Sequence, residues 1–314
     1  MKKLIATVIL MIALVLPQTA FGWNATGHKL VASIAWDNLS EQARSNIVNL
    51  LSQAPKGDCL RELFASSGGS LADRQREFFV LAATWPDIIR GGKDVPKKCT
   101  QLHRPEWHFK DRFWSGFSGD TVNPPKDLNR PLAKINAVER LDKFRPFVAG
   151  SGNAGTRAED LAWILHLVGD IHQPLHTSGR VTSTEQNGDV GGNSFKLGSG
   201  KKPLQLHSYW DNIVDRHDPR GKNEDPASYV QRLTRDVQNA FPKSHFGNLE
   251  PGQFDKWALE SLEKAQQNAY PRGLKRGQLP NGAYETKTFN LAEESIALAG
   301  YRLADLLETL FGLH

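Results

Sequence analysis

Apolar residues recur with helical spacing through most of the chain after residue 22, and this periodicity constrains the fold more than any other feature. The first such segment presents one apolar helix face, formed by Leu30, Val31, Ile34 and Ala35. The same spacing predicts helices over 28–38, 42–53, 74–84, 132–144, 158–173, 226–240, 253–269 and 291–310. Extended patterns are confined to 107–110 and 193–197, and the longest loop is expected over 178–202. We therefore predict an all-α fold: a single compact helical domain with long loops and at most a short β-hairpin.

The first 22 residues have the pattern of a secretory signal peptide. Lys2 and Lys3 precede an apolar run over 4–16, and Ala20 and Gly22 supply small residues before a cut at Trp23. The apolar run is shorter than the roughly 20 residues that span a membrane, which argues against an uncleaved anchor. We expect residues 1–22 to be removed, leaving 23–314 as one secreted or periplasmic domain without membrane association.

Cysteine and histidine usage limits the kind of metal site that this chain can build. The 314 residues include two cysteines and ten histidines, so a four-cysteine zinc site is excluded and imidazole and carboxylate ligands are favoured. In an exported chain Cys59 and Cys99 can form a disulfide, and two unpaired buried thiols are the alternative. The formal charge of +5 includes Lys2 and Lys3 of the leader, so the mature chain is only weakly basic.

Two His-x-x-x-Asp pairs flank the long loop. His166 and Asp170 are four residues apart and therefore share one face of a predicted helix, as do His207 and Asp211. Pro174 ends or bends the first of these helices and redirects His176. One such pair is often an ordinary surface contact, but two in an exported chain with few cysteines predict a metal site.

Further candidate ligands lie upstream. Asp87 follows a tryptophan and a proline, His108 lies between two aromatic residues, and His28 lies near the mature N-terminus. Taken singly, these residues could be a helix cap, a core histidine and a solvated residue. Cleavage before Trp23 would create an α-amine with a pKa near 8, and this amine and its own carbonyl can chelate a metal together.

The chain carries six motifs in a characteristic order. They are Trp23 to His28, Trp85-Pro86-Asp87, His108 to Asp111, His166-x-x-x-Asp170 followed by His176, Gly191-Gly192-Asn193, and His207-x-x-x-Asp211. In these motifs the chain resembles the S1/P1 nuclease family, extracellular trinuclear zinc enzymes that cut single-stranded nucleic acids. The resemblance implies a phospholipase C/P1 nuclease-like helical fold.

The resemblance also implies three Zn²⁺ per chain and assigns their ligands. The first ion would be held by Asp87, His108, His166 and Asp170. A second, more separate ion would be held by His176, His207 and Asp211. The third would be held by the Trp23 amine and carbonyl together with His28, and Asp170 would bridge it to the first.

Catalytic and substrate-binding roles are implied in the same way. Asp87, Asp170 and Arg90 would act in catalysis, Arg90 by stabilising charge on the phosphoryl group. Phe109 would stack on a base, Asp111 would hydrogen-bond its edge, and Asn193 would line the pocket. His172 lies close to the ligands in sequence and is a candidate to support one of them.

The expected enzyme is a monomeric endonuclease acting on single-stranded DNA and RNA. Its products would be 5′-phosphorylated, and 3′-mononucleotides would be further substrates. The main alternative is a zinc-dependent phospholipase C, which shares the fold but carries a glutamate where Asp211 stands. A zinc-dependent binding module without catalysis is a third reading.

Overall fold

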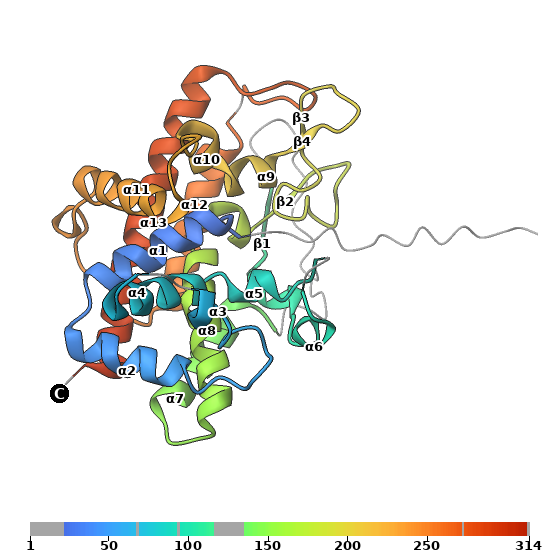
Figure 1. Cartoon of the computed structure of the whole chain (residues 1–314). Helices are drawn as coiled ribbons and strands as arrows, with labels where there is room; N and C mark the ends of the chain where they lie inside the picture. The colour runs from blue at the N-terminus through green and yellow to red at the C-terminus, as the bar shows by residue number, and fades with distance from the viewer. Residues whose placement is uncertain (1–21, 67–68, 93–94, 116–134, 272, 313–314) are drawn as a thin grey trace, which may run out of the picture.

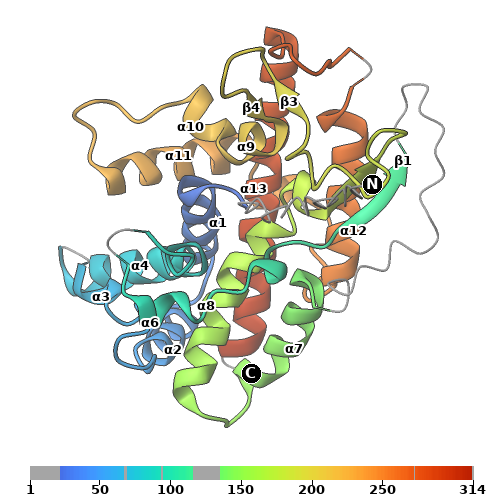
Figure 2. The same cartoon turned by 90° about the vertical axis from the view of Figure 1, so that its right-hand side faces the viewer.

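The computed structural model of the chain describes residues 22–66, 69–92, 95–115, 135–271 and 273–312. Figures 1 and 2 show helices packed around two long central ones, α8 and α13. The helices are α1 (Ala25–Asp37), α2 (Glu41–Leu51), α3 (Leu63–Ser66), α4 (Leu71–Ala82), α5 (Trp85–Ile88), α6 (Lys97–Thr100), α7 (Ala137–Ala149), α8 (Ala154–Asp170), α9 (Leu206–Asp211), α10 (Ile213–His217), α11 (Pro226–Ala240), α12 (Phe254–Lys264) and α13 (Gly282–Phe311). The predicted all-α class is confirmed.

Asparagine side chains begin the three helices that matter most for the core. Asn24 accepts a hydrogen bond from Gly27 N at the start of α1, Asn153 caps α8 and Asn281 caps α13. Each cap satisfies a backbone N–H that has no partner inside its own helix. Helix α1 packs closely along α13 because Gly300 has no side chain: a Cβ there would lie 2.6 Å from Ile34 Cβ.

Every predicted helix is present, with shifts at the ends. The predicted 132–144 helix is α7, which begins only after Asn136 caps Glu139 N and continues past Pro146; residues 132–134 lie outside the described residues. Pro146 lies inside this helix and removes one i→i−4 hydrogen bond near its C-terminal end. The predicted 253–269 helix continues from α12 into a π-helical turn over Ala265–Ala269.

The strands are few and short. β1 (Arg112–Ser115) pairs in parallel with β2 (Ser178–Val181), and β3 (Lys196–Leu197) pairs antiparallel with β4 (Leu204–Gln205). The second pair is the predicted short hairpin, whereas the parallel pair was not predicted. The extended pattern expected over 107–110 is wrong in its first half, because Pro105 starts a 3₁₀ turn over Pro105–His108 and extended backbone begins only at Phe109.

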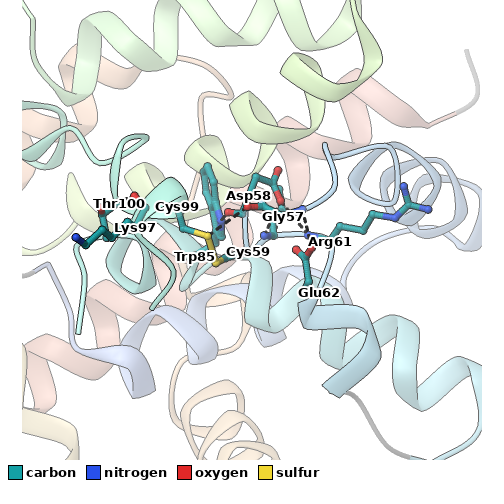
Figure 3. Close-up of a disulfide and its surroundings, with 10 residues drawn as sticks. Gly57, Asp58, Cys59, Arg61, Glu62, Trp85, Lys97, Cys99 and Thr100 are labelled. Carbon is teal, nitrogen blue, oxygen red and sulfur yellow. Dashed lines mark hydrogen bonds between the residues drawn. A yellow bond between two sulfur atoms is a disulfide. The ribbon is translucent and has the colours of Figure 1, made fainter. Parts of the chain in front are cut away.

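A disulfide joins Cys59 to Cys99 on α6, with the Cα atoms 5.9 Å apart. The predicted pairing is confirmed, and the alternative of two unpaired thiols is wrong. Figure 3 shows Trp85, the first residue of α5, beside this bridge, and its indole N–H donates to Asp58 O at 2.8 Å. The bridge therefore supports the short helix that carries Asp87.

No helix within the described ranges is both long and apolar enough to cross a lipid bilayer. The predicted signal peptide, apart from Gly22, falls outside the described residues.

Candidate metal centre

Histidine and aspartate side chains from six elements converge at one end of α8. Within the described residues they form three groups in which all candidate ligand atoms lie within 4.8 Å of one another. The groups are Asp87, His108 and His166; His28, His166 and Asp170; and His176, His207 and Asp211. Every side-chain ligand expected from the sequence lies in at least one group.

The first group is built on the last turn of α8. His166 and Asp170 share one helix face, and His166 Nε2 lies 3.2 Å from Asp170 Oδ2. His108, at the end of its 3₁₀ turn, brings Nδ1 to 3.1 Å from the same oxygen and 3.0 Å from His166 Nε2. Asp87 Oδ1 completes the group at 4.0 Å from His166 Nε2.

The second group shares His166 with the first and adds Asp170, whose other oxygen faces His28. His28 on α1 lies with Nε2 3.4 Å from Asp170 Oδ1, and its ring stacks on His166 with centroids 3.8 Å apart. Trp23 is fully buried, and the next residue, Asn24, donates its backbone N–H to Asp211 O at 3.0 Å. The segment formed by Trp23 and Asn24 therefore lies between the second group and the third.

The third group contains two imidazoles that face each other. His176 Nε2 and His207 Nε2 are 3.1 Å apart, while Nδ1 of each ring lies 2.6 Å from a backbone carbonyl, His108 O and Gly191 O respectively. In a neutral ring the carbonyl places the proton on Nδ1, which leaves a lone pair on each Nε2. Two lone pairs cannot hydrogen-bond each other, but both can bind one cation, and Asp211 Oδ2 lies 3.5 Å from His207 Nε2.

Several of these buried polar atoms lack a hydrogen-bond partner in the described structure. They are both ring nitrogens of His28, Nε2 of His108, Oδ1 of Asp170 and Oδ2 of Asp211. Burying such atoms without a partner is unfavourable, and a bound cation would satisfy them. Nitrogen and oxygen donors at these separations fit a divalent metal such as zinc.

Burial and neighbouring charges shift the pKa values of two of these ligands, His28 and Asp170, in the direction that favours metal binding. Burial and the nearby His166 lower the pKa of His28 to about 4, so its ring is neutral near pH 7. Burial alone would raise the pKa of Asp170, but His166 and His176 outweigh it and hold that pKa well below its usual value. Asp170 is therefore an ionised carboxylate between two groups.

Comparison with known proteins agrees with a metal cluster of this kind. The S1/P1 Nuclease family model matches residues 23–312. The chain belongs to the S1/P1 nuclease family. It is 24% identical to Nuclease S1 of Aspergillus oryzae, over 94% of each chain. It is 25% identical to Endonuclease 2 of Arabidopsis thaliana, over 93% of this chain and 91% of that one, and 22% identical to Nuclease P1 of Penicillium citrinum, over 92% and 98%. The enzyme is therefore a nuclease.

The residues expected to contact substrate border the clusters of this S1/P1 nuclease. Arg90 Nη1 donates to Asp87 Oδ1 at 3.1 Å, so the guanidinium lies beside the first group. Phe109 and Asp111 follow His108 and are partly exposed. Between them, Lys110 N donates to His176 O at 2.8 Å, which fixes this strip of backbone against the third group.

Asn193 lies in the loop that supports His207. Its side-chain amide donates to Val190 O at 2.9 Å, and the side chain is buried. Gly191 and Gly192 have φ values of 58° and 83°, and a Cβ on Gly191 would lie 2.5 Å from Leu175 O. Glycine is required here because this close turn points Gly191 O at the His207 ring.

Sequence reasoning misjudged one neighbour of the ligands and missed another. His172 points away from the clusters: its Nδ1 lies 2.7 Å from Val168 O, and its Nε2 accepts from Arg302 Nη1 at 3.0 Å. Gln173, which was not singled out, donates to Asp211 Oδ1 at 2.7 Å. The only sequence signal for Gln173 is its position between His166 and His176.

Proposed function

We propose that residues 23–314 form one nuclease domain that binds three zinc ions and hydrolyses phosphodiester bonds of single-stranded DNA and RNA. The products carry a 5′-phosphate, and the same site removes the phosphate from 3′-mononucleotides. The observation that carries this proposal is the presence of three adjacent His/Asp groups, two of them sharing His166, with buried donor atoms that lack hydrogen-bond partners. All these side chains come from one chain, so the site needs no residue of a partner subunit, and we propose that the enzyme acts as a monomer.

The proposed ligand sets follow the three groups. Asp87, His108, His166 and Asp170 hold the first ion; His176, His207 and Asp211 hold the second; and Asp170, His28 and the amine and carbonyl of Trp23 hold the third. When bound, zinc withdraws charge from phosphate oxygens and makes water a competent nucleophile near neutral pH. Asp170 serves two ions because its two oxygens face different groups.

Residues around the clusters hold the substrate. Arg90, kept in position by its bond to Asp87, stabilises the growing charge on the phosphoryl oxygens. Phe109 offers an aromatic face on which one unpaired base stacks, and Asp111 accepts a hydrogen bond from the edge of that base. Asn193 closes the pocket from the loop side. A duplex keeps its bases stacked internally, so this arrangement favours single strands.

Processing completes the third ligand set. A Cβ on Gly22 would lie 1.7 Å from Asp170 Oδ1 and 2.9 Å from His28 Nε2, so the residue before Trp23 lies against these two ligands. While Gly22 is attached, the Trp23 nitrogen is an amide that binds metal poorly. The family match beginning at Trp23 supports cleavage at this bond. We propose that cleavage accompanies export and that the mature enzyme is secreted or periplasmic.

Metal analysis and a substrate panel test this function. The processed protein should contain about three zinc ions per chain. Denatured DNA, RNA, a 3′-mononucleotide and a short-chain phosphatidylcholine should be offered separately. Cleavage of the first three supports the proposal, whereas hydrolysis of the lipid alone would establish a phospholipase C instead. Zinc binding without turnover of any of them would indicate a binding module.

A further inference from the structure

Two short segments beside the third metal group contain positive charges and no acidic residue. Residues 191–207 include Lys196, Lys201 and Lys202, and residues 273–282 include Lys275 and Arg276. Neither segment contains aspartate or glutamate. The net charge of the whole chain is +5 and two of its lysines lie in the leader, so these segments carry more positive charge than the mature domain has in total.

The two segments pack into one surface, which we call the basic ridge. Gly277 N donates to Lys196 O at 2.9 Å, and Arg276 Nη1 donates to Ser194 O at 2.6 Å. The Arg276 guanidinium also lies 4.5 Å from the ring centroid of Phe195. Figures 1 and 2 show the β3–β4 hairpin beside the segment that leads into α13. Hydrogen bonds therefore hold together segments that are far apart in sequence.

The ridge is continuous with the metal centre. Lys196 Nζ donates to Asn193 O at 2.9 Å, and Leu206 N donates to Phe195 O at 2.8 Å. β4 leads directly into α9, which carries His207 and Asp211. A single-stranded nucleic acid that extends from the third metal group along the β3–β4 hairpin therefore contacts the ridge first.

The five cations of the ridge have different roles. Lys196 is bonded to Asn193 O, and Arg276 forms an ion pair with Glu185, so these two stabilise the ridge itself. Lys201, Lys202 and Lys275 are exposed, and within the described residues no ion pair to a carboxylate involves them. These three ammonium groups remain available to a polyanion.

We propose that Lys201, Lys202 and Lys275 bind backbone phosphates of a single-stranded nucleic acid outside the nucleotide that is cut. This inference rests on the proposed function and extends it from the cleaved bond to the flanking strand. Phosphates repeat along any sequence, so these contacts increase affinity for long substrates without selecting bases. A mononucleotide lacks these flanking phosphates, so its hydrolysis should not depend on the three lysines.

The test compares two triple variants that remove the same charge. The ridge variant is Lys201→Gln, Lys202→Gln and Lys275→Gln; the control is Lys56→Gln, Lys222→Gln and Lys287→Gln, three exposed lysines elsewhere. kcat/KM is measured on a long single strand between about 50 and 200 mM salt. Each phosphate contact contributes a slope of about −0.7 to a plot of log kcat/KM against log salt concentration. With three contacts, kcat/KM of wild type should fall about 18-fold more over this range than kcat/KM of the ridge variant.

The outcomes separate the ridge from the proposed function. Support requires a reduced salt slope in the ridge variant, a wild-type slope in the control, and equal rates of both on a 3′-mononucleotide. A wild-type slope in the ridge variant overturns the proposal, as does an equal loss of slope in the control. A loss of mononucleotide activity in the ridge variant also overturns it, because the lysines then act on the metal site. If wild type cleaves no single strand, the proposed function itself has failed.

Discussion

The side-chain amide of Asn24 lies 2.6 Å from Asp215 Oδ2 and ties the second residue of the mature domain to α10. Asn24 makes further bonds: its side-chain amide also donates to Asn212 Oδ1 at 3.1 Å, its backbone N–H donates to Asp211 O, and its side-chain oxygen accepts from Gly27 N. Asp215 is in turn fixed by the hydroxyl of Tyr229 at 2.9 Å. These bonds hold Trp23 beside the ligands, and they give the N-terminus a defined position.

Replacing Asn24 by alanine should loosen the N-terminus and lower zinc occupancy. Asn24→Ala removes both the tie to Asp215 and a helix cap, and the lost cap alone destabilises by about 1 kcal/mol. Asn281→Ala removes an equivalent cap from α13 and serves as the control. We expect fewer zinc ions per chain after dialysis in Asn24→Ala only. Equal zinc contents in the two variants would show that Asn24 acts as a cap alone.

Retention of Gly22 should also lower zinc binding by the ligand set that includes Trp23. A chain that begins at Gly22 has an amide nitrogen at Trp23 and a residue lying against Asp170 and His28. We expect it to bind about one zinc ion fewer than the chain beginning at Trp23 and to lose most of its activity. Metal analysis beside single-strand cleavage assays checks both. Matching zinc content and rate would exclude the Trp23 amine as a ligand.

Replacing Phe109 should weaken cleavage of single strands and leave the zinc content unchanged. Phe109→Ala removes a stacking partner worth about 1–3 kcal/mol per base, so kcat/KM on single strands should fall roughly 5- to 150-fold. Phe147→Ala, at a partly exposed phenylalanine on α7, is the control and should cleave at the wild-type rate. A reduced zinc content in Phe109→Ala would instead reveal a structural role.

Glu159 should make stability depend on pH. Burial, with smaller contributions from Asp58 and Asp160, raises the pKa of this carboxyl from 4.5 to about 7. The folded state therefore binds a proton that the unfolded state releases, so this contribution to stability is present below pH 4.5 and is lost as pH rises to about 7. The melting temperature of the zinc-loaded enzyme should fall less between pH 5 and pH 8 in Glu159→Gln than in wild type. Glu263→Gln, at an exposed glutamate, should follow wild type.

The sequence was sufficient for features set by local geometry. The i, i+4 spacing of His166 and Asp170 requires only a helix, and Pro174 does redirect His176 into a 3₁₀ turn. Export predicted the Cys59–Cys99 bridge because oxidising compartments favour pairing.

Features set by tertiary packing were beyond the sequence. The parallel pairing of β1 with β2 joins segments on either side of α7 and α8, and no local pattern encodes it. His172 turns from the ligands because Arg302 on α13 supplies a buried donor for its Nε2. The side-chain amide of Asn193 donates to Val190 O within its own loop, and its contact with substrate remains a prediction.

Gly22 has a further consequence for the cell that makes this enzyme. A nuclease is synthesised in the presence of the messenger and ribosomal RNA on which its own production depends. In the full-length chain Gly22 lies against the side chains of Asp170 and His28. On the proposal that the chain is cut before Trp23, the cut that yields the mature enzyme is also the step that frees Asp170 and His28 and completes the third ligand set.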